Sequence, residues 1–117
     1  MRIIVAIAAA PLLFTALPAR AQDPAVASAA IAAGDYASAE NALASELRIH
    51  PNRPELLLNL AAVYANTGRT SEARALYRKV LDQREVLMDL TPEKTASSYA
   101  VAYTGLKRIS ALQVTSR

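Results

Sequence analysis

Apolar residues recur at spacings of three and four along most of the chain, which is the pattern of helices that bury one face. Residues 54–67 differ because they are apolar around more than half of the helix circumference, which predicts burial on two sides. The single stripes on either side consist of Tyr36, Ala39, Leu43 and Leu47, and of Ala73, Leu76, Tyr77, Val80 and Leu81. The pattern therefore predicts an all-α protein with residues 54–67 as its central helix.

A short unit occurs twice in this helical region. Gly34 and Gly68 occupy the same place in the two copies, and the residues that follow them correspond in order. A glycine at such a position can take the left-handed conformation that closes the end of a helix. An internal period of this size is typical of stacked repeats. We therefore expect two helical hairpins, each with its corner at a glycine.

The region after the second unit departs from the repeat. Pro51 ends the first copy, but the equivalent position after Gly68 is Glu85, which does not stop a helix. We therefore predict that the fourth helix continues through Leu87 and Met88. The sequence Thr91-Pro92-Glu93 has the order of a helix start, so a fifth helix is predicted from Pro92 to about Gln113. The sequence leaves open whether this helix is continuous through Gly105.

The 34-residue register resembles the tetratricopeptide repeat. The second copy carries the resemblance at Leu57, Leu60, Ala61, Tyr64, Gly68, Ala73, Tyr77 and Val80, and the first at Val26, Ala27, Gly34, Tyr36, Ala39, Leu43, Leu47 and Pro51. The resemblance implies an all-α fold, a short right-handed superhelical stack of antiparallel helix pairs. We expect repeat 1 over residues 22–53, repeat 2 with an extended second helix over 54–90, and a C-terminal capping helix, a partial third repeat, over 91–117.

The first 21 residues have the features of a secretory signal peptide. Met1-Arg2 is a positive start, an apolar run follows from Ile3 to Leu17, and Ala19-Arg20-Ala21 is a cleavage pattern. The alternative is a retained membrane anchor, but about 15 apolar residues is short against the roughly 20 that span a bilayer. We expect cleavage after Ala21, no membrane association afterwards, and export to the periplasm of a Gram-negative bacterium.

Charge and composition exclude several classes of function. Removal of residues 1–21 takes away Arg2 and Arg20, so 13 basic residues become 11 against 10 acidic ones and the net charge falls from +3 to +1. Nucleic-acid binding then lacks electrostatic support. The chain has no cysteine and one histidine, His50, so a metal site, a catalytic residue and a cofactor are not expected. We predict a protein that is not an enzyme.

The resemblance also implies a site, because the first helix of each pair in this family lines a concave groove. The residues at these positions are Glu55, Leu58, Asn59, Ala62 and Asn66 in the second copy and Ser28 and Ile31 in the first. We expect a scaffold or adaptor that binds another protein or a peptide there, with Asn59 and Asn66 as polar contacts. Alternatively, these polar residues only form a solvated face.

A different class of function also fits the sequence. A structural protein could self-assemble as a homodimer through an apolar surface of its C-terminal helices, made of Leu87, Met88, Tyr99 and Tyr103. An accessory subunit of an enzyme is a third hypothesis. The sequence identifies neither the partner nor the oligomeric state.

Overall fold

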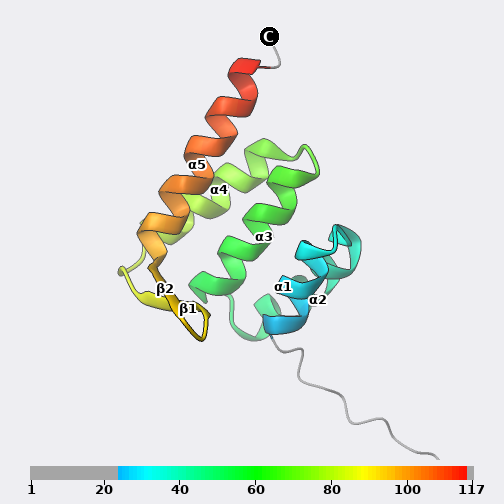
Figure 1. Ribbon diagram of the computed structural model, residues 1–117, viewed down its shortest axis with the longest axis vertical. Helices are drawn as coiled ribbons and strands as arrows, with labels where there is room; N and C mark the ends of the chain where they lie inside the picture. The colour runs from blue at the N-terminus through cyan, green and yellow to red at the C-terminus, as the bar shows by residue number, and fades with distance from the viewer. Residues whose placement is uncertain (1–23, 116–117) are drawn as a thin grey trace, which may run out of the picture.

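The computed structural model describes residues 24–115 (Figure 1). Within this range the chain forms helices α1 (Pro24–Ala32), α2 (Tyr36–Ile49), α3 (Pro54–Asn66) and α4 (Thr70–Leu81), then strands β1 (Leu87–Thr91) and β2 (Lys94–Ser97), and finally helix α5 (Ser98–Thr115). The predicted signal peptide and its cleavage point lie outside the described residues. The predicted all-α stack of helix pairs is confirmed, with a β-hairpin added between α4 and α5.

The two glycine corners have the same hydrogen-bonded geometry. Gly34 and Gly68 have φ angles of +77° and +80°. After the first glycine, the Asp35 amide donates to the Ala30 carbonyl at 2.9 Å, and after the second, the Arg69 amide donates to the Tyr64 carbonyl at 2.8 Å. Both bonds run back over the same stretch of chain, as in the helix closure that requires a left-handed residue. The repeat period therefore reflects one local structure formed twice.

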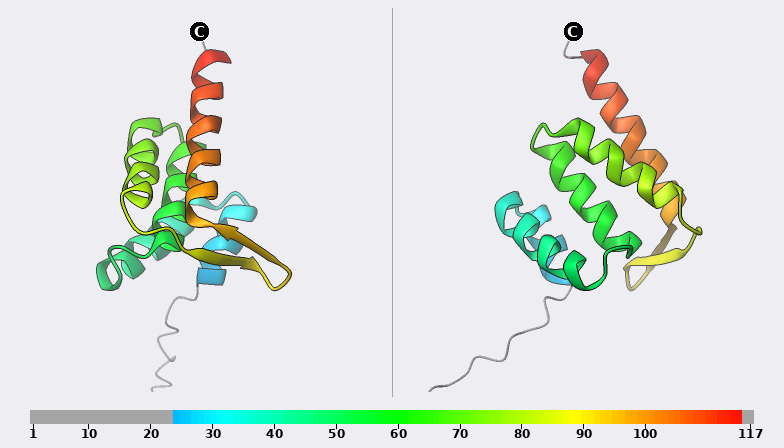
Figure 2. Two further views of the ribbon diagram at one scale, coloured as in Figure 1. Left: turned by 90° about the vertical axis from the view of Figure 1, so that its left-hand side faces the viewer. Right: turned by 180° about the vertical axis from the view of Figure 1, so that it is seen from behind.

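Helix α3 is the centre of the structure and is buried on two faces, as predicted. It lies between the α1–α2 pair and the α4–α5 side, and Figure 2 shows the same order from behind. One apolar cluster joins α3 to α1 and α2, and the other joins α3 to α4, α5 and β1. The α3 side chains in the first cluster are Leu56, Leu60 and Val63, and those in the second are Leu57, Leu58 and Ala61.

Small residues occupy the places where helices cross. Ala27, Ala39, Ala61 and Ala73 are all buried, and their small side chains allow the helices to pack closely. On α5 the buried residues are Ser98, Ala102, Gly105 and Ile109. Tyr103 is 60% exposed and the adjacent Ala102 is buried, so the face of α5 that carries Tyr103 points away from the core. A small residue at position 102 lets α5 approach the core more closely than tyrosine would.

The prediction of an extended fourth helix is wrong. Helix α4 ends at Leu81, and Leu87 and Met88 belong to β1. The fifth helix starts at Ser98 instead of Pro92, and it is continuous through Gly105. Residues 92 and 93 form the turn of an antiparallel hairpin, in which Met88 pairs with Ala96 and Asp89 with Thr95. Proline suits the second position of such a turn as well as the start of a helix, so its local pattern was ambiguous.

Tertiary contacts at both ends of the hairpin explain why it forms. Met88 is 3% exposed and packs into the cluster with α3, α4 and α5. The Ser98 hydroxyl is buried and accepts a hydrogen bond from the Val86 amide at 3.0 Å, and the Ser98 amide donates to the Val86 carbonyl at 2.8 Å. Ser97 caps α5, since its hydroxyl accepts from the Tyr99 and Ala100 amides. A two-stranded hairpin is marginal alone, so these anchors stabilise it.

Candidate functional site

A trough runs along the side of α3 that faces the hairpin and α5. It consists of three adjoining cavities: a central one of about 390 Å³, one of about 140 Å³ towards the N-terminus of α3, and one of about 110 Å³ towards its C-terminus. The central and N-terminal cavities share Leu58 and Asn59, and the central and C-terminal cavities share Ala62 and Tyr77. Because neighbouring cavities share walls, the three form one elongated depression.

Most of the predicted groove residues line this trough. Glu55, Leu58, Asn59 and Ser28 line the N-terminal cavity, and Ala62 and Asn66 line the C-terminal one. Ile31 does not line any of the three cavities and packs instead against the α1–α2–α3 cluster. Helix α3 therefore supplies one wall, and α1 contributes Ser28 at the edge.

The opposite wall comes from the hairpin, where the predicted secondary structure was wrong, and from α5. The hairpin contributes Leu90 and Lys94, and α5 contributes residues that include Val101, Thr104 and Arg108. Leu90 lies at an irregularity in the strand pairing between Asp89 and Thr91 and lines two of the cavities. Leu90 and Lys94 were not predicted because the sequence pattern placed residues 87–97 in helices, and the α5 residues were not predicted because that pattern did not place the helix opposite α3. The available indication was the β-branched and turn-forming composition of residues 86–97.

Tyr77 and Gly105 form the floor of the central cavity. A Cβ atom at Gly105 would overlap the Tyr77 ring, with the ring Cε2 only 2.6 Å away, so the missing side chain is what lets α5 lie on the tyrosine. Burial raises the pKa of the Tyr77 hydroxyl, and the charge of Arg108 partly offsets this. The close contact fixes the spacing between α4 and α5 and with it the width of the trough.

The Asn59 side chain and the Tyr77 hydroxyl, both in the trough wall, have no hydrogen-bond partner within residues 24–115. The Asn59 side chain is half-buried and makes no hydrogen bond there, and neither does the Tyr77 hydroxyl. No fully buried side-chain oxygen or nitrogen in the described part of the chain lacks a partner, so the Tyr77 hydroxyl keeps some contact with solvent, and Tyr77 lines the trough. Asn66 differs, because its amide donates to the Ala62 carbonyl at 2.7 Å. Asn59 and Tyr77 thus remain able to bond a ligand, unlike Asn66.

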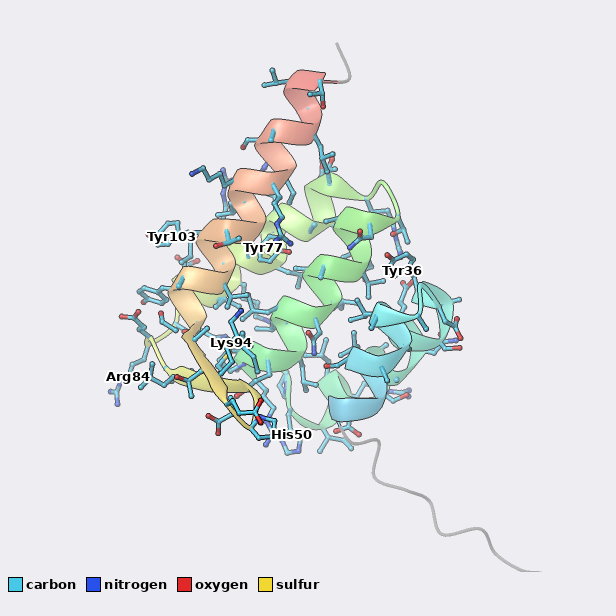
Figure 3. All side chains as sticks on the ribbon, in the orientation of Figure 1. Tyr36, His50, Tyr77, Arg84, Lys94 and Tyr103 are labelled. Carbon is cyan, nitrogen blue, oxygen red and sulfur yellow. The ribbon has the colours of Figure 1, made fainter. Side chains whose placement is uncertain are left out.

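Charged side chains are separated along the trough. Lys94 and Arg108 line the central cavity, where the described residues place no carboxylate. Glu55 and Asp89 line the N-terminal cavity, where no lysine or arginine of the described residues lies. Figure 3 shows Lys94 and Tyr77 on the strip between α3 and α5, whereas Arg84 and Tyr36 lie at the outer edges of the molecule. The trough therefore has a basic section beside an acidic section.

An ion pair holds the two repeats together away from the trough. The two terminal guanidinium nitrogens of Arg69 donate to the Glu40 carboxylate, at 2.9 and 2.6 Å, and the Arg69 guanidinium lies 4.2 Å from the centre of the Tyr64 ring. The hydrogen bond from Arg69 lowers the pKa of Glu40. The pair links α2 to the second glycine corner and thereby stabilises the stack of repeats. Neither residue lines the trough.

The predicted dimer surface is not a single patch. Leu87 is 80% exposed and Tyr103 is 60% exposed, but Met88 is buried in the core. The Tyr99 hydroxyl donates to the Gln83 carbonyl within the chain. Burial of Met88 follows from the alternation of a strand, which turns Leu87 and Met88 to opposite faces. Only two of the four predicted residues remain prominent on the surface.

Other classes of site were sought within residues 24–115. This part of the chain contains no group of three or more histidine, aspartate or glutamate side chains placed to hold a metal ion. None of its helices combines the length and the apolar character that crossing a bilayer requires. His50 is exposed at the end of α2, where its amide donates to the Glu46 carbonyl.

Comparison with known proteins gives one positive result. No curated protein and no solved structure matches the chain significantly. Residues 30–86 match a family model described as Tetratricopeptide repeat. The match begins within α1 and extends past α4, so it covers both glycine corners and stops before the hairpin is formed. The match supports the assignment of the helical segment of residues 30–86 to the tetratricopeptide repeat family, whose members typically mediate protein–protein interaction without catalysis.

Proposed function

We propose that this protein is an exported, non-catalytic adaptor that binds an extended segment of another protein in the trough beside α3. The observation that carries the proposal is the trough itself, which follows the length of α3 and has a largely apolar wall with Asn59 and Tyr77 unpartnered inside it. Binding would need no cofactor. Apolar contact would supply affinity, and hydrogen bonds from Asn59 and Tyr77 to a peptide backbone would fix its position.

A variant that fills the trough tests this function. Ala62 lines the central and C-terminal cavities, so Ala62→Trp should block an occupant. Ala75→Trp is the matched control, because Ala75 is exposed on α4 and lines none of the three cavities. Wild type and both variants would be used to capture partners from exported fractions, after circular dichroism has shown equal helix content. A partner retained by Ala75→Trp and lost by Ala62→Trp supports the proposal, and identical recovery from all three contradicts it.

Export is proposed from the sequence of residues 1–21. Expression of the whole gene product in a Gram-negative host, followed by intact mass measurement of the protein from the periplasm, tests it. We expect a chain that begins at Gln22. Recovery from the cytoplasm with residues 1–21 still attached would contradict export.

Self-assembly is the alternative function, and it has narrower support. Leu87 and Tyr103 are exposed, but Met88 is buried and cannot contribute to a surface without unfolding the hairpin. Sedimentation velocity of the purified protein distinguishes the two functions. We expect a monomer, and a dimer that Leu87→Asp and Tyr103→Asp dissociate would favour self-assembly.

A further inference from the structure

The basic section of the trough has charges that nothing in the described structure neutralises. Lys94 comes from β2 and Arg108 from α5, and both line the central cavity. Neither side chain forms an ion pair or a hydrogen bond within residues 24–115. Both are exposed, so water now solvates them, and a ligand carboxylate beside them would gain from two cations next to an apolar wall.

The acidic section lies immediately beside the basic one. Glu55 and Asp89 line the N-terminal cavity, which shares Leu58, Asn59, Leu90 and Val101 with the central cavity. Neither carboxylate forms an ion pair within the described residues. The shared residues are mostly apolar, so an occupant meets negative charge, then an apolar stretch, then positive charge.

The shape of the trough favours a chain over a small anion. From Glu55 to Asn66 the helix rises about 16 Å, at about 1.5 Å per residue. An extended peptide covers that length with about five residues, at about 3.3 Å each. A small anion would contact only Lys94 and Arg108 and would leave the apolar wall and the acidic section unused. Asn59, near the middle, can both donate to and accept from a peptide backbone.

We infer that the occupant is an extended peptide segment with an acidic side chain beside Lys94 and Arg108, apolar residues against Leu58 and Val101, and a basic side chain towards Glu55 and Asp89. This inference rests on the proposed function and specifies the chemistry of its partner. The two charged residues of the peptide would lie on either side of its apolar residues, because the two cavities share Leu58, Leu90 and Val101. The order of charges gives the segment one direction in the trough.

Selection from a random heptapeptide display library tests the inference directly. The purified protein is immobilised at about 0.15 M salt, where exposed charges more than about 8 Å apart are largely screened. Enriched peptides should contain an aspartate or glutamate and a lysine or arginine with apolar residues between them. The best of these peptides, made synthetically, should bind in solution.

Charge reversal supplies the decisive comparison. The double variant Lys94→Glu with Arg108→Glu should bind the peptide selected on the wild type at least about tenfold more weakly. New selection on this variant should enrich basic residues at the same position. The matched control is Arg84→Glu with Lys107→Glu, which makes the same change in net charge at exposed residues that line none of the three cavities. The control should keep the wild-type preference and affinity.

The outcomes separate this inference from the proposed function. The inference is overturned if the selected peptides show no preference for an acidic residue, or if both double variants weaken their binding equally. If Ala62→Trp still excludes those peptides, the trough remains a binding site. Absence of any peptide that Ala62→Trp excludes would overturn both. Equal thermal stability of the two double variants, measured by circular dichroism, ensures that weaker binding is not caused by unfolding.

Discussion

The repeated region, residues 24–81, and the region that follows it, residues 82–115, use glycine for opposite reasons. Gly34 and Gly68 have positive φ angles and open space where a side chain would be. Gly105 lies within α5, and a side chain there would meet the Tyr77 ring. The first two glycines satisfy a backbone requirement, and the third satisfies a packing requirement between distant segments. The comparison shows that the repeats follow from interactions between residues close in sequence, whereas the second wall of the trough depends on packing between distant segments.

The largest effect is expected from Gly105→Ala. A glycine inside a helix is normally replaced by alanine with a gain of roughly 0.5–1 kcal/mol, so the sequence alone predicts a more stable protein. The overlap with Tyr77 reverses the sign, and we expect a loss of about 2 kcal/mol or more, measured by urea unfolding. In the background Tyr77→Leu the cost should shrink. A stabilised Gly105→Ala protein would contradict the packing of α5 on Tyr77.

A larger side chain at the crossing of two repeat helices should lower the free energy of unfolding slightly less than Gly105→Ala does. Ala73 is fully buried at the α3–α4 crossing, and Ala73→Leu should destabilise the protein by about 1–3 kcal/mol. Ala75→Leu is the matched control, since it makes the same change at an exposed position of α4 and should be almost neutral. Coincident thermal melts of the two variants would mean that the small residue at the crossing is not required.

The glycine corners should respond alike to substitution. Gly34→Ala and Gly68→Ala force a side chain into the left-handed region without any steric contact, so each should cost about 1–2 kcal/mol. Chemical unfolding of both variants checks this. A cost that differs widely between the corners would show that the second corner depends on something beyond backbone conformation, such as the Arg69–Glu40 pair.

Removal of a helix cap in each region should have a smaller effect on stability. Ser97 caps α5 by accepting from two amides, and Asp35 caps α2 by accepting from the Ser38 amide at 3.2 Å. Ser97→Ala and Asp35→Ala should each cost about 1 kcal/mol in urea unfolding. Hydrogen exchange should locate the loss at the start of α5 for the first and of α2 for the second. No change at α5 after Ser97→Ala would place the start of that helix elsewhere.

The smallest effect concerns the exposed Glu40–Arg69 pair. Arg69 lowers the pKa of Glu40 in the folded protein, so the pair adds stability above the ordinary carboxyl pKa of 4.5 and loses it as the pH falls through the lower folded value. Glu40→Gln should therefore flatten the acid side of a plot of Tm against pH. Glu46→Gln on the same helix is the control, because Glu46 forms no ion pair within residues 24–115. Equal flattening in both variants would argue against the pair.

The residues that line the trough divide between what could be predicted and what could not. Glu55, Leu58, Asn59 and Ala62 were predictable because they share one face of a helix whose ends and neighbours follow from the repeat. Lys94 and Arg108 were not, because they reach the site only after residues 82–97 fold back as a loop and a hairpin. The local pattern Thr91-Pro92-Glu93 suits both a helix start and a turn.

The sequence by itself determined the four repeat helices, the two left-handed corners and the double burial of α3. Each of these depends on spacings and residue types that lie close together in the sequence. Only the tertiary structure decided the hairpin, the start of α5 and the face that α5 buries. Those depend on Met88 entering the core and on Gly105 of α5 lying against Tyr77 of α4, and periodicity along the chain carries no information about such contacts.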